Sequence, residues 1–119
     1  MRTKQEVFDT VATHLLTQNQ KALNSDGKCR YRTSSGLTCA IGCLFPKNLD
    51  VSGIENETVT AVLGSKYAKF LIISDLVSES SFYTQLQHIH DDNPTTKWRG
   101  ELVRFAENNN LNDDIFRSL

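Results

Sequence analysis

The chain has 119 residues, 39% of them hydrophobic and 23% charged, which is the profile of a globular domain and not of a disordered or fibrous chain. Its 13 Lys and Arg residues against 14 Asp and Glu residues give a net charge of −1. The basic excess typical of general nucleic-acid binders is missing, so we expect no nucleic-acid partner. The length fits a single domain, residues 1–119, that buries about two thirds of its surface on folding.

Membrane insertion and secretion are not expected. The longest strongly apolar run, Phe70–Ile73, is too short to cross a bilayer. No apolar stretch of the kind found in secretion signals follows Met1. We therefore expect a cytoplasmic protein whose three cysteines stay reduced.

The first predicted element is an amphipathic helix over residues 3–23. Thr3 and Glu6 have the spacing of a capping box at its start, and Ser25–Gly27 supplies turn residues after its end. Apolar residues recur at three- and four-residue steps and define the buried face: Phe8, Val11, Ala12, Leu15, Leu16, Ala22 and Leu23.

Residues 28–45 change character. Cys29 and Tyr31 alternate with Arg30 and Arg32, and this period predicts a small β-hairpin near residues 28–38, with both arginines on the face opposite Tyr31. Two interpretations remain for the residues that follow. They form either a return strand or a short helix over 39–45 that begins at Thr38 and stops before Pro46, and we favour the helix.

The remaining elements are all predicted to be helical. After a loop over residues 46–56, we expect short helices over 57–63 (from Asn56 to Gly64) and from Ser65 onward. A helix ending near residues 90–92, another starting at Asn93-Pro94 and a final turn capped by Asn112 complete the chain. The predicted fold is mainly α: a single compact domain of five or six short helices with a small β-hairpin near residues 28–38.

One Cys-rich pattern resembles a known group of sequences. It consists of Cys29-Arg30-Tyr31-Arg32 followed by Gly36-Leu37-Thr38-Cys39-Ala40-Ile41-Gly42-Cys43-Leu44-Phe45-Pro46, with Leu86-Gln87-His88-Ile89-His90-Asp91 and Trp98 further on. This pattern, C-x-Y-R…G-L-x-C-A-I-G-x-L-x-P, is similar to that of a group of small uncharacterised bacterial and phage proteins. The resemblance implies a context and no activity: an accessory protein carried by a phage or prophage.

The cysteines allow two chemical interpretations. Cys29, Cys39 and Cys43 with His88 or His90 are zinc-ligand types, although no tight C-x-x-C pair is present. In the second, Cys39 at a helix N-terminus is a nucleophile. His88 or His90 would be its base, oriented by Asp91 or Asp92. The alternative to both is that the cysteines are small buried hydrophobic residues, which is the common role of free cysteine.

A third candidate is a recognition surface made of Arg30, Tyr31 and Arg32. Two arginines can bind a phosphate or an acidic partner through paired hydrogen bonds, whereas the alternative is an ordinary solvated edge. The leading interpretation is a non-enzymatic protein-interaction domain that needs no cofactor. It would bind a host or phage protein, with steric inhibition of a bacterial defence protein as its specific form. A Cys39-dependent enzyme and a small structural zinc protein are the alternatives.

Overall fold

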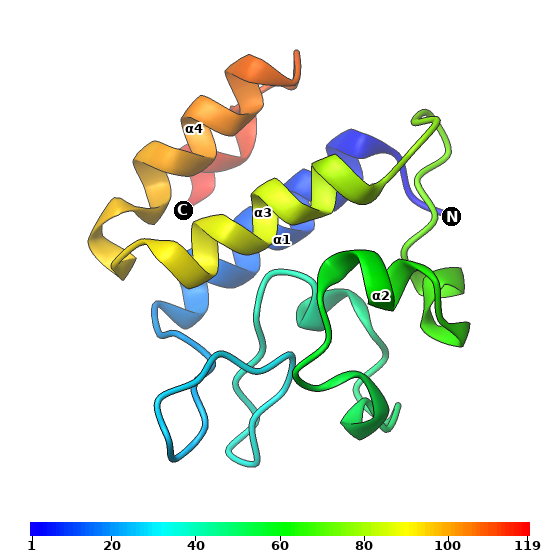
Figure 1. Ribbon diagram of the computed structural model, residues 1–119. Helices are drawn as coiled ribbons and strands as arrows, with labels where there is room; N and C mark the ends of the chain where they lie inside the picture. Colours follow the sequence, from blue (N-terminus) through cyan, green and yellow to red (C-terminus); the bar gives the residue numbers. More distant parts are fainter.

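The computed structural model describes residues 1–119, and its regular structure is helical (Figure 1). Its α-helices are α1 (Lys4–Gln18), α2 (Val59–Leu63), α3 (Ser80–Asp92) and α4 (Trp98–Asn108). None of the helices combines the length and the apolar character that crossing a bilayer requires. Short 3-10 helices lie between and after them: η1 (Gly42–Leu44), η2 (Ser52–Ile54), η3 (Lys66–Phe70), η4 (Thr95–Lys97) and η5 (Asp114–Ser118).

The mainly α class is therefore confirmed, with four α-helices in place of the expected five or six. No β-strand forms, and extended pairing is limited to isolated bridges between Leu23 and Cys29, Arg32 and Thr38, and Arg2 and Ile73. The expected hairpin near residues 28–38 is thus reduced to single bridges that close two tight loops.

Helices α1, α3 and α4 meet at a cluster of three aromatic rings. Helix α4 packs against both α1 and α3, and α2 packs against α3 (Figure 1). The ring of Phe105 in α4 stacks on Phe8 of α1 at a centroid distance of 5.8 Å and meets Phe82 of α3 edge-on at 5.0 Å. Because the three rings come from three helices, their burial fixes the helices relative to one another.

Helix α1 starts as predicted and ends earlier. The Thr3 hydroxyl accepts from the Glu6 N–H at 3.1 Å and the Glu6 carboxylate accepts from the Thr3 N–H at 2.9 Å, so the capping box is confirmed. The helix was expected to reach residue 23, but Asn19 adopts a left-handed conformation (φ 50°) that ends it at Gln18. Ala22 is still buried, outside the helix.

The strand expected around Tyr31 does not form because its backbone donors are used elsewhere. The N–H groups of Tyr31 and Arg32 donate to the Glu55 carboxylate at 2.8 and 3.2 Å, where a strand would donate to a neighbouring strand. The favoured helix over 39–45 is also wrong, since only η1 forms there. The Thr38 hydroxyl, its expected cap, instead lies 2.8 Å from Nε2 of His14.

Helix α2 begins later than expected. It starts at Val59 and is capped by Thr58, whose hydroxyl accepts from the Ala61 N–H at 3.2 Å, because Asn56 takes a left-handed conformation (φ 68°). It ends at Gly64 as predicted.

Three other predicted caps have mixed outcomes. Ser65 does cap η3, although this helix stops at Phe70. The Asn112 side chain accepts from the N–H of Asp114 at the start of η5, but the cap position itself is occupied by Asp113. Pro94 is extended and does not start α4, which begins only after η4.

Residues 19–58, here called the coil layer, contain no regular structure except η1 and η2. Side chains from α1 hold part of it. The Gln18 amide donates to the Thr38 carbonyl (2.9 Å) and accepts from the Thr38 N–H (3.1 Å), and His14 Nε2 donates to the same carbonyl at 2.9 Å. From within the coil layer, the Arg32 guanidinium donates to the carbonyls of Pro46, Lys47 and Leu49.

The coil layer contains one very close backbone approach. A Cβ atom on Gly42 would lie 1.9 Å from the carbonyl oxygen of Tyr31. The same oxygen accepts from the Cys39 N–H at 3.3 Å, so the two segments are bound together at this point. Only glycine fits there, because any Cβ would overlap the Tyr31 carbonyl.

We expect Gly42→Ala to lower the free energy of unfolding by about 3 kcal/mol or more, because the methyl group meets backbone and not a flexible side chain. Gly100→Ala is the matched control. Gly100 lies inside α4 with open space around it, so alanine is expected to raise the free energy of unfolding by about 0.5–1 kcal/mol. Urea unfolding followed by Trp98 fluorescence measures both, and equal stabilities for the two variants would contradict the close approach.

Candidate functional site

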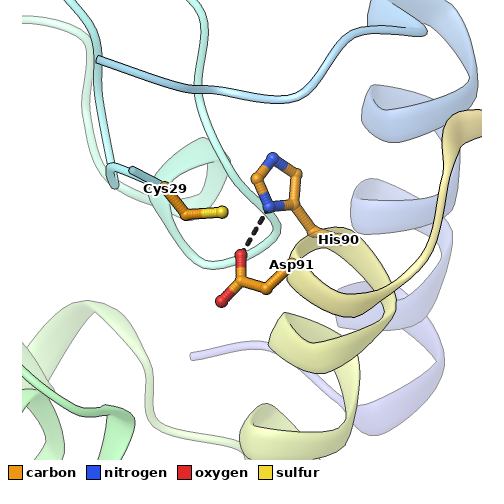
Figure 2. A group of neighbouring side chains, drawn as sticks. All are labelled: Cys29, His90 and Asp91. Carbon is orange, nitrogen blue, oxygen red and sulfur yellow. Dashed lines mark hydrogen bonds and ion pairs between the residues drawn. The ribbon is translucent and has the colours of Figure 1, made fainter. Parts of the chain in front are cut away.

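Three side chains of the sequence-level candidates meet at one end of α3. Donor atoms of Cys29, His90 and Asp91 all lie within 4.8 Å of one another (Figure 2). His90 and Asp91 belong to the last turn of α3, and Cys29 reaches them from the coil layer, where its bridge to Leu23 holds it. The expected partner of His90, Cys39, is not a member of this group.

The hydrogen bonds of His90 define its tautomer. The side chain is fully buried and its ring stacks on Trp98 at a centroid distance of 5.5 Å. Its Nε2 accepts the backbone N–H of Ala22 at 3.0 Å and therefore carries a lone pair and no proton. The ring proton sits on Nδ1 and is donated to the Asp91 carboxylate at 2.7 Å (Figure 2). Both ring nitrogens are thus engaged inside the fold.

Asp91 is held as a carboxylate. Burial raises the pKa of Asp91, but the hydrogen bonds from His90, the Cys29 thiol and the Gln87 amide outweigh burial and leave the pKa below its ordinary value. The Gln87 amide donates to the same oxygen of Asp91 at 3.0 Å. Gln87 also accepts the Ile41 N–H at 3.2 Å, so one side chain connects this site to the coil layer.

All three thiols are protonated at neutral pH. Burial, reinforced by the Asp91 carboxylate, raises the pKa of Cys29 to about 11. Burial raises the pKa of Cys43 to about 12, and the Cys43 thiol donates to the Ala40 carbonyl at 3.1 Å. Cys39 is completely buried, which raises the pKa of its thiol furthest, and its sulfur accepts the Gly42 N–H at 3.2 Å.

This geometry does not assemble the Cys39 nucleophile. No α-helix begins at Cys39, so no helix dipole favours its thiolate. His90 has no free ring nitrogen to take the thiol proton. The other candidate base, His88, is exposed and pairs with Asp92 at 3.4 Å.

The donor set also falls short of a structural zinc site, which takes four ligands. The cluster offers three donors, and Cys39, Cys43 and His88 lie outside it. A metal ion at Nδ1 of His90 would displace the ring proton to Nε2, which faces the Ala22 N–H. Zinc binding would therefore cost the buried backbone group its acceptor.

A pocket of about 350 Å³ lies beside the cluster, and mostly polar residues line it. Cys29, Arg30, Tyr31 and Asp91 line it, and the Tyr31 hydroxyl donates to the Glu57 carbonyl at 2.7 Å. Arg32 does not line this pocket. Because no strand forms, the expected placement of both arginines opposite Tyr31 is wrong.

Comparisons of the chain with protein-family models, with curated proteins and with solved structures give no match. The structure nevertheless accounts for two of the sequence patterns singled out above. The segment that starts at Cys29 and the one that ends at Asp91 are far apart in the chain and form one site. Sequence reasoning missed Glu55, which no motif marks, and Gln87, whose place inside Leu86–Asp91 was a usable signal.

We expect native thiol alkylation to be slow at all three cysteines. With a pKa of about 11, only about one Cys29 thiol in a thousand is ionised at pH 8, against about a quarter of ordinary free cysteines. Iodoacetamide labelling followed by mass spectrometry measures the rates, with the urea-unfolded chain as the control. Rapid native labelling of Cys39 below pH 8 would restore the nucleophile hypothesis.

Asp91→Asn is expected to flatten the acid limb of the stability–pH profile. The folded chain keeps Asp91 ionised at lower pH than the unfolded chain does. Its contribution is therefore complete above about pH 4 and is lost as the pH falls through the lowered folded pKa. Urea unfolding between pH 2 and 6 measures this, and Asp113→Asn, on the chain surface before η5, is the control. An unchanged slope in Asp91→Asn would contradict the ionised carboxylate.

The protonation of each ring nitrogen of His90 can be measured by NMR. Long-range ¹H–¹⁵N spectra of the imidazoles are expected to show His90 protonated at Nδ1 and bare at Nε2. Addition of equimolar zinc is expected to leave these signals unchanged, because Nδ1 offers no lone pair. A stoichiometric zinc-induced shift of the His90 signals would instead identify a metal ligand.

Proposed function

We propose that this chain is a non-catalytic protein-binding domain, a small cytoplasmic accessory factor that covers a surface of a larger protein. In its specific form, it inhibits a bacterial defence protein on behalf of a phage or prophage. The resemblance of its Cys-rich pattern to small bacterial and phage proteins supports the context. The geometry supports the class, because the thiols and the buried imidazole are engaged in holding the fold.

The observation that carries the proposal is the free guanidinium of Arg30. Arg30 lines the pocket beside the cluster, and its side chain makes no hydrogen bond or ion pair within the chain. By contrast, the guanidinium of Arg32, two residues away, donates hydrogen bonds to three backbone carbonyls. An arginine that presents its five donors to a pocket suits paired hydrogen bonding with a carboxylate, and arginine is enriched among the residues that dominate binding energy.

The backbone around Arg30 is fixed before any partner arrives. The N–H of Arg30 donates to the Ala22 carbonyl at 2.7 Å, and the next two N–H groups are bound by Glu55. A side chain on a fixed backbone loses less entropy on binding than one on a mobile loop.

The pocket wall indicates the polar character of the partner. The carboxylates of Glu57 and Asp91 line the same pocket as Arg30. A partner segment that offers one carboxylate to Arg30 and N–H donors to these two acids would match both charges. Hydroxyl groups of Thr58, Thr60 and Thr84 complete the polar wall.

The test is affinity capture from bacterial lysate with mild cross-linking, comparing the wild-type chain with Arg30→Glu. The wild-type chain is expected to recover a stoichiometric partner, and the charge reversal to reduce recovery by about tenfold or more. Arg117→Glu, at an exposed position in η5, is the control and should recover the partner normally. Equal recovery by Arg30→Glu would place the interface elsewhere, and no partner under several lysate conditions would contradict the proposal.

A further inference from the structure

Three hollows adjoin on a surface that shares no lining residue with the Arg30 pocket. The central hollow, of about 480 Å³, lies between the N-terminus, η1 and the end of η3. It shares Cys43 and Phe45 with a hollow of about 490 Å³, and Lys69 and Phe70 with one of about 290 Å³. Because each outer hollow shares two lining residues with the central one, we take the three together and call them the basic groove.

The groove is strongly positive although the chain carries a net charge of −1. Among the charged residues that line it, Asp50 is the single acid, and the Asp50 carboxylate accepts the Ser52 N–H at 2.9 Å. Five of the 13 basic residues line the groove: Arg2, Arg32, Lys47, Lys66 and Lys69. This asymmetry attracts an acidic partner to this side of the molecule.

The floor of the central hollow is apolar. Six of its nine lining residues are hydrophobic. Two of these lining residues are accessible to solvent: Met1 is 88% exposed and Ile72 is 43% exposed. Both line the hollow with the half-buried Phe70. An apolar floor surrounded by cations fits a segment that carries both acidic and apolar side chains.

The aromatic rings of the groove are not available to nucleobases. The ammonium groups of Lys66 and Lys69 lie over the rings of Tyr67 and Phe70, 5.5 and 5.3 Å from their centroids. Phe45 is buried. Sites for single-stranded nucleic acids typically combine a basic groove with free aromatic faces for base stacking, so the groove favours a protein ligand.

The walls of the groove are held in place from inside. Arg2 donates to the Phe70 carbonyl at 3.2 Å, and its backbone pairs with the Ile73 region. The rings of Phe45 and Phe70 meet edge-on at 6.0 Å. The Arg32 guanidinium holds residues 46–49, which carry Lys47, through their carbonyls. A groove built in this way needs little rearrangement to accept a ligand.

We propose that the basic groove binds an extended acidic segment of a partner protein. Carboxylates of this segment pair with Lys47 and Lys69, and an apolar side chain lies on the floor between Met1 and Ile72. This inference goes beyond the proposed function, because it assigns a second surface and the chemistry of its ligand independently of Arg30.

The test sorts a yeast-displayed library of random dodecapeptides against the full chain and measures the affinity of enriched peptides by fluorescence anisotropy. Enriched peptides are expected to be acidic, with at least one Leu, Ile or Phe. The double variant Lys47→Glu/Lys69→Glu is expected to weaken their binding about tenfold or more, and Ile72→Ser several-fold. Lys97→Glu, at an exposed lysine outside the groove, is the matched control and should change affinity less than about twofold.

The outcomes separate this inference from the proposed function. Loss of peptide binding in the lysine double variant but not in Arg30→Glu supports the groove. Loss in Arg30→Glu alone overturns the groove and supports the Arg30 pocket. Enriched peptides without an acidic bias, or tighter binding of a single-stranded RNA dodecamer than of any peptide, also overturn it. Circular dichroism of each variant confirms that these exposed substitutions leave the chain folded.

Discussion

The structure depends on how the backbone of the coil layer is satisfied. Buried N–H and C=O groups must find partners, and residues 19–58 contain no α-helix or strand and only the short 3-10 helices η1 and η2. Polar side chains from α1 and α3 supply the missing bonds, with Gln18 at Thr38, Gln87 at Ile41 and His90 at Ala22. These bonds hold the coil layer against α1 and α3, and the coil layer supplies Cys29 and Arg30 to the pocket beside α3.

The same constraint engages a cluster that has the composition of an active site. A thiol, an imidazole and a carboxylate with donor atoms within 4.8 Å of one another are groups that catalytic and metal sites commonly use. Their function is decided by the groups they face. The one ring lone pair of His90 accepts a backbone N–H, and the ring N–H on the other side donates to Asp91. The residues that remain open to a partner, Arg30 and the groove lysines, are the ones the coil layer does not need.

Features with local causes could be predicted from the sequence. The start of α1, the end of α2 at Gly64 and the hydrogen bond from Asp114 to Asn112 before η5 each depend on residues within one turn. The absence of a strand at Tyr31 could not be predicted, because it depends on Glu55, 24 residues away. Similarly, the contact of the Thr38 hydroxyl with His14, 24 residues away, could not be predicted from the residues around Thr38. The members of the Cys29 cluster were all recognised as candidates, but their grouping required the tertiary structure. The Arg30 pocket was anticipated in part, and the basic groove left no signal in a chain of near-neutral charge.

The bond between Ala22 and His90 spans 68 residues and has a consequence for synthesis on the ribosome. At about 5–20 residues per second, the acceptor is made roughly 3–14 s after the donor it must satisfy. Until then, the Ala22 N–H lacks its acceptor and the side of the coil layer that packs on α3, which includes Cys29, remains uncovered. Helix α1 can form early and can meet Thr38 and η1 soon afterwards, but its helical partner α4 is made near the end of the chain. Commitment to the native state therefore belongs to the last third of translation, and premature termination before α3 would release a chain unable to fold.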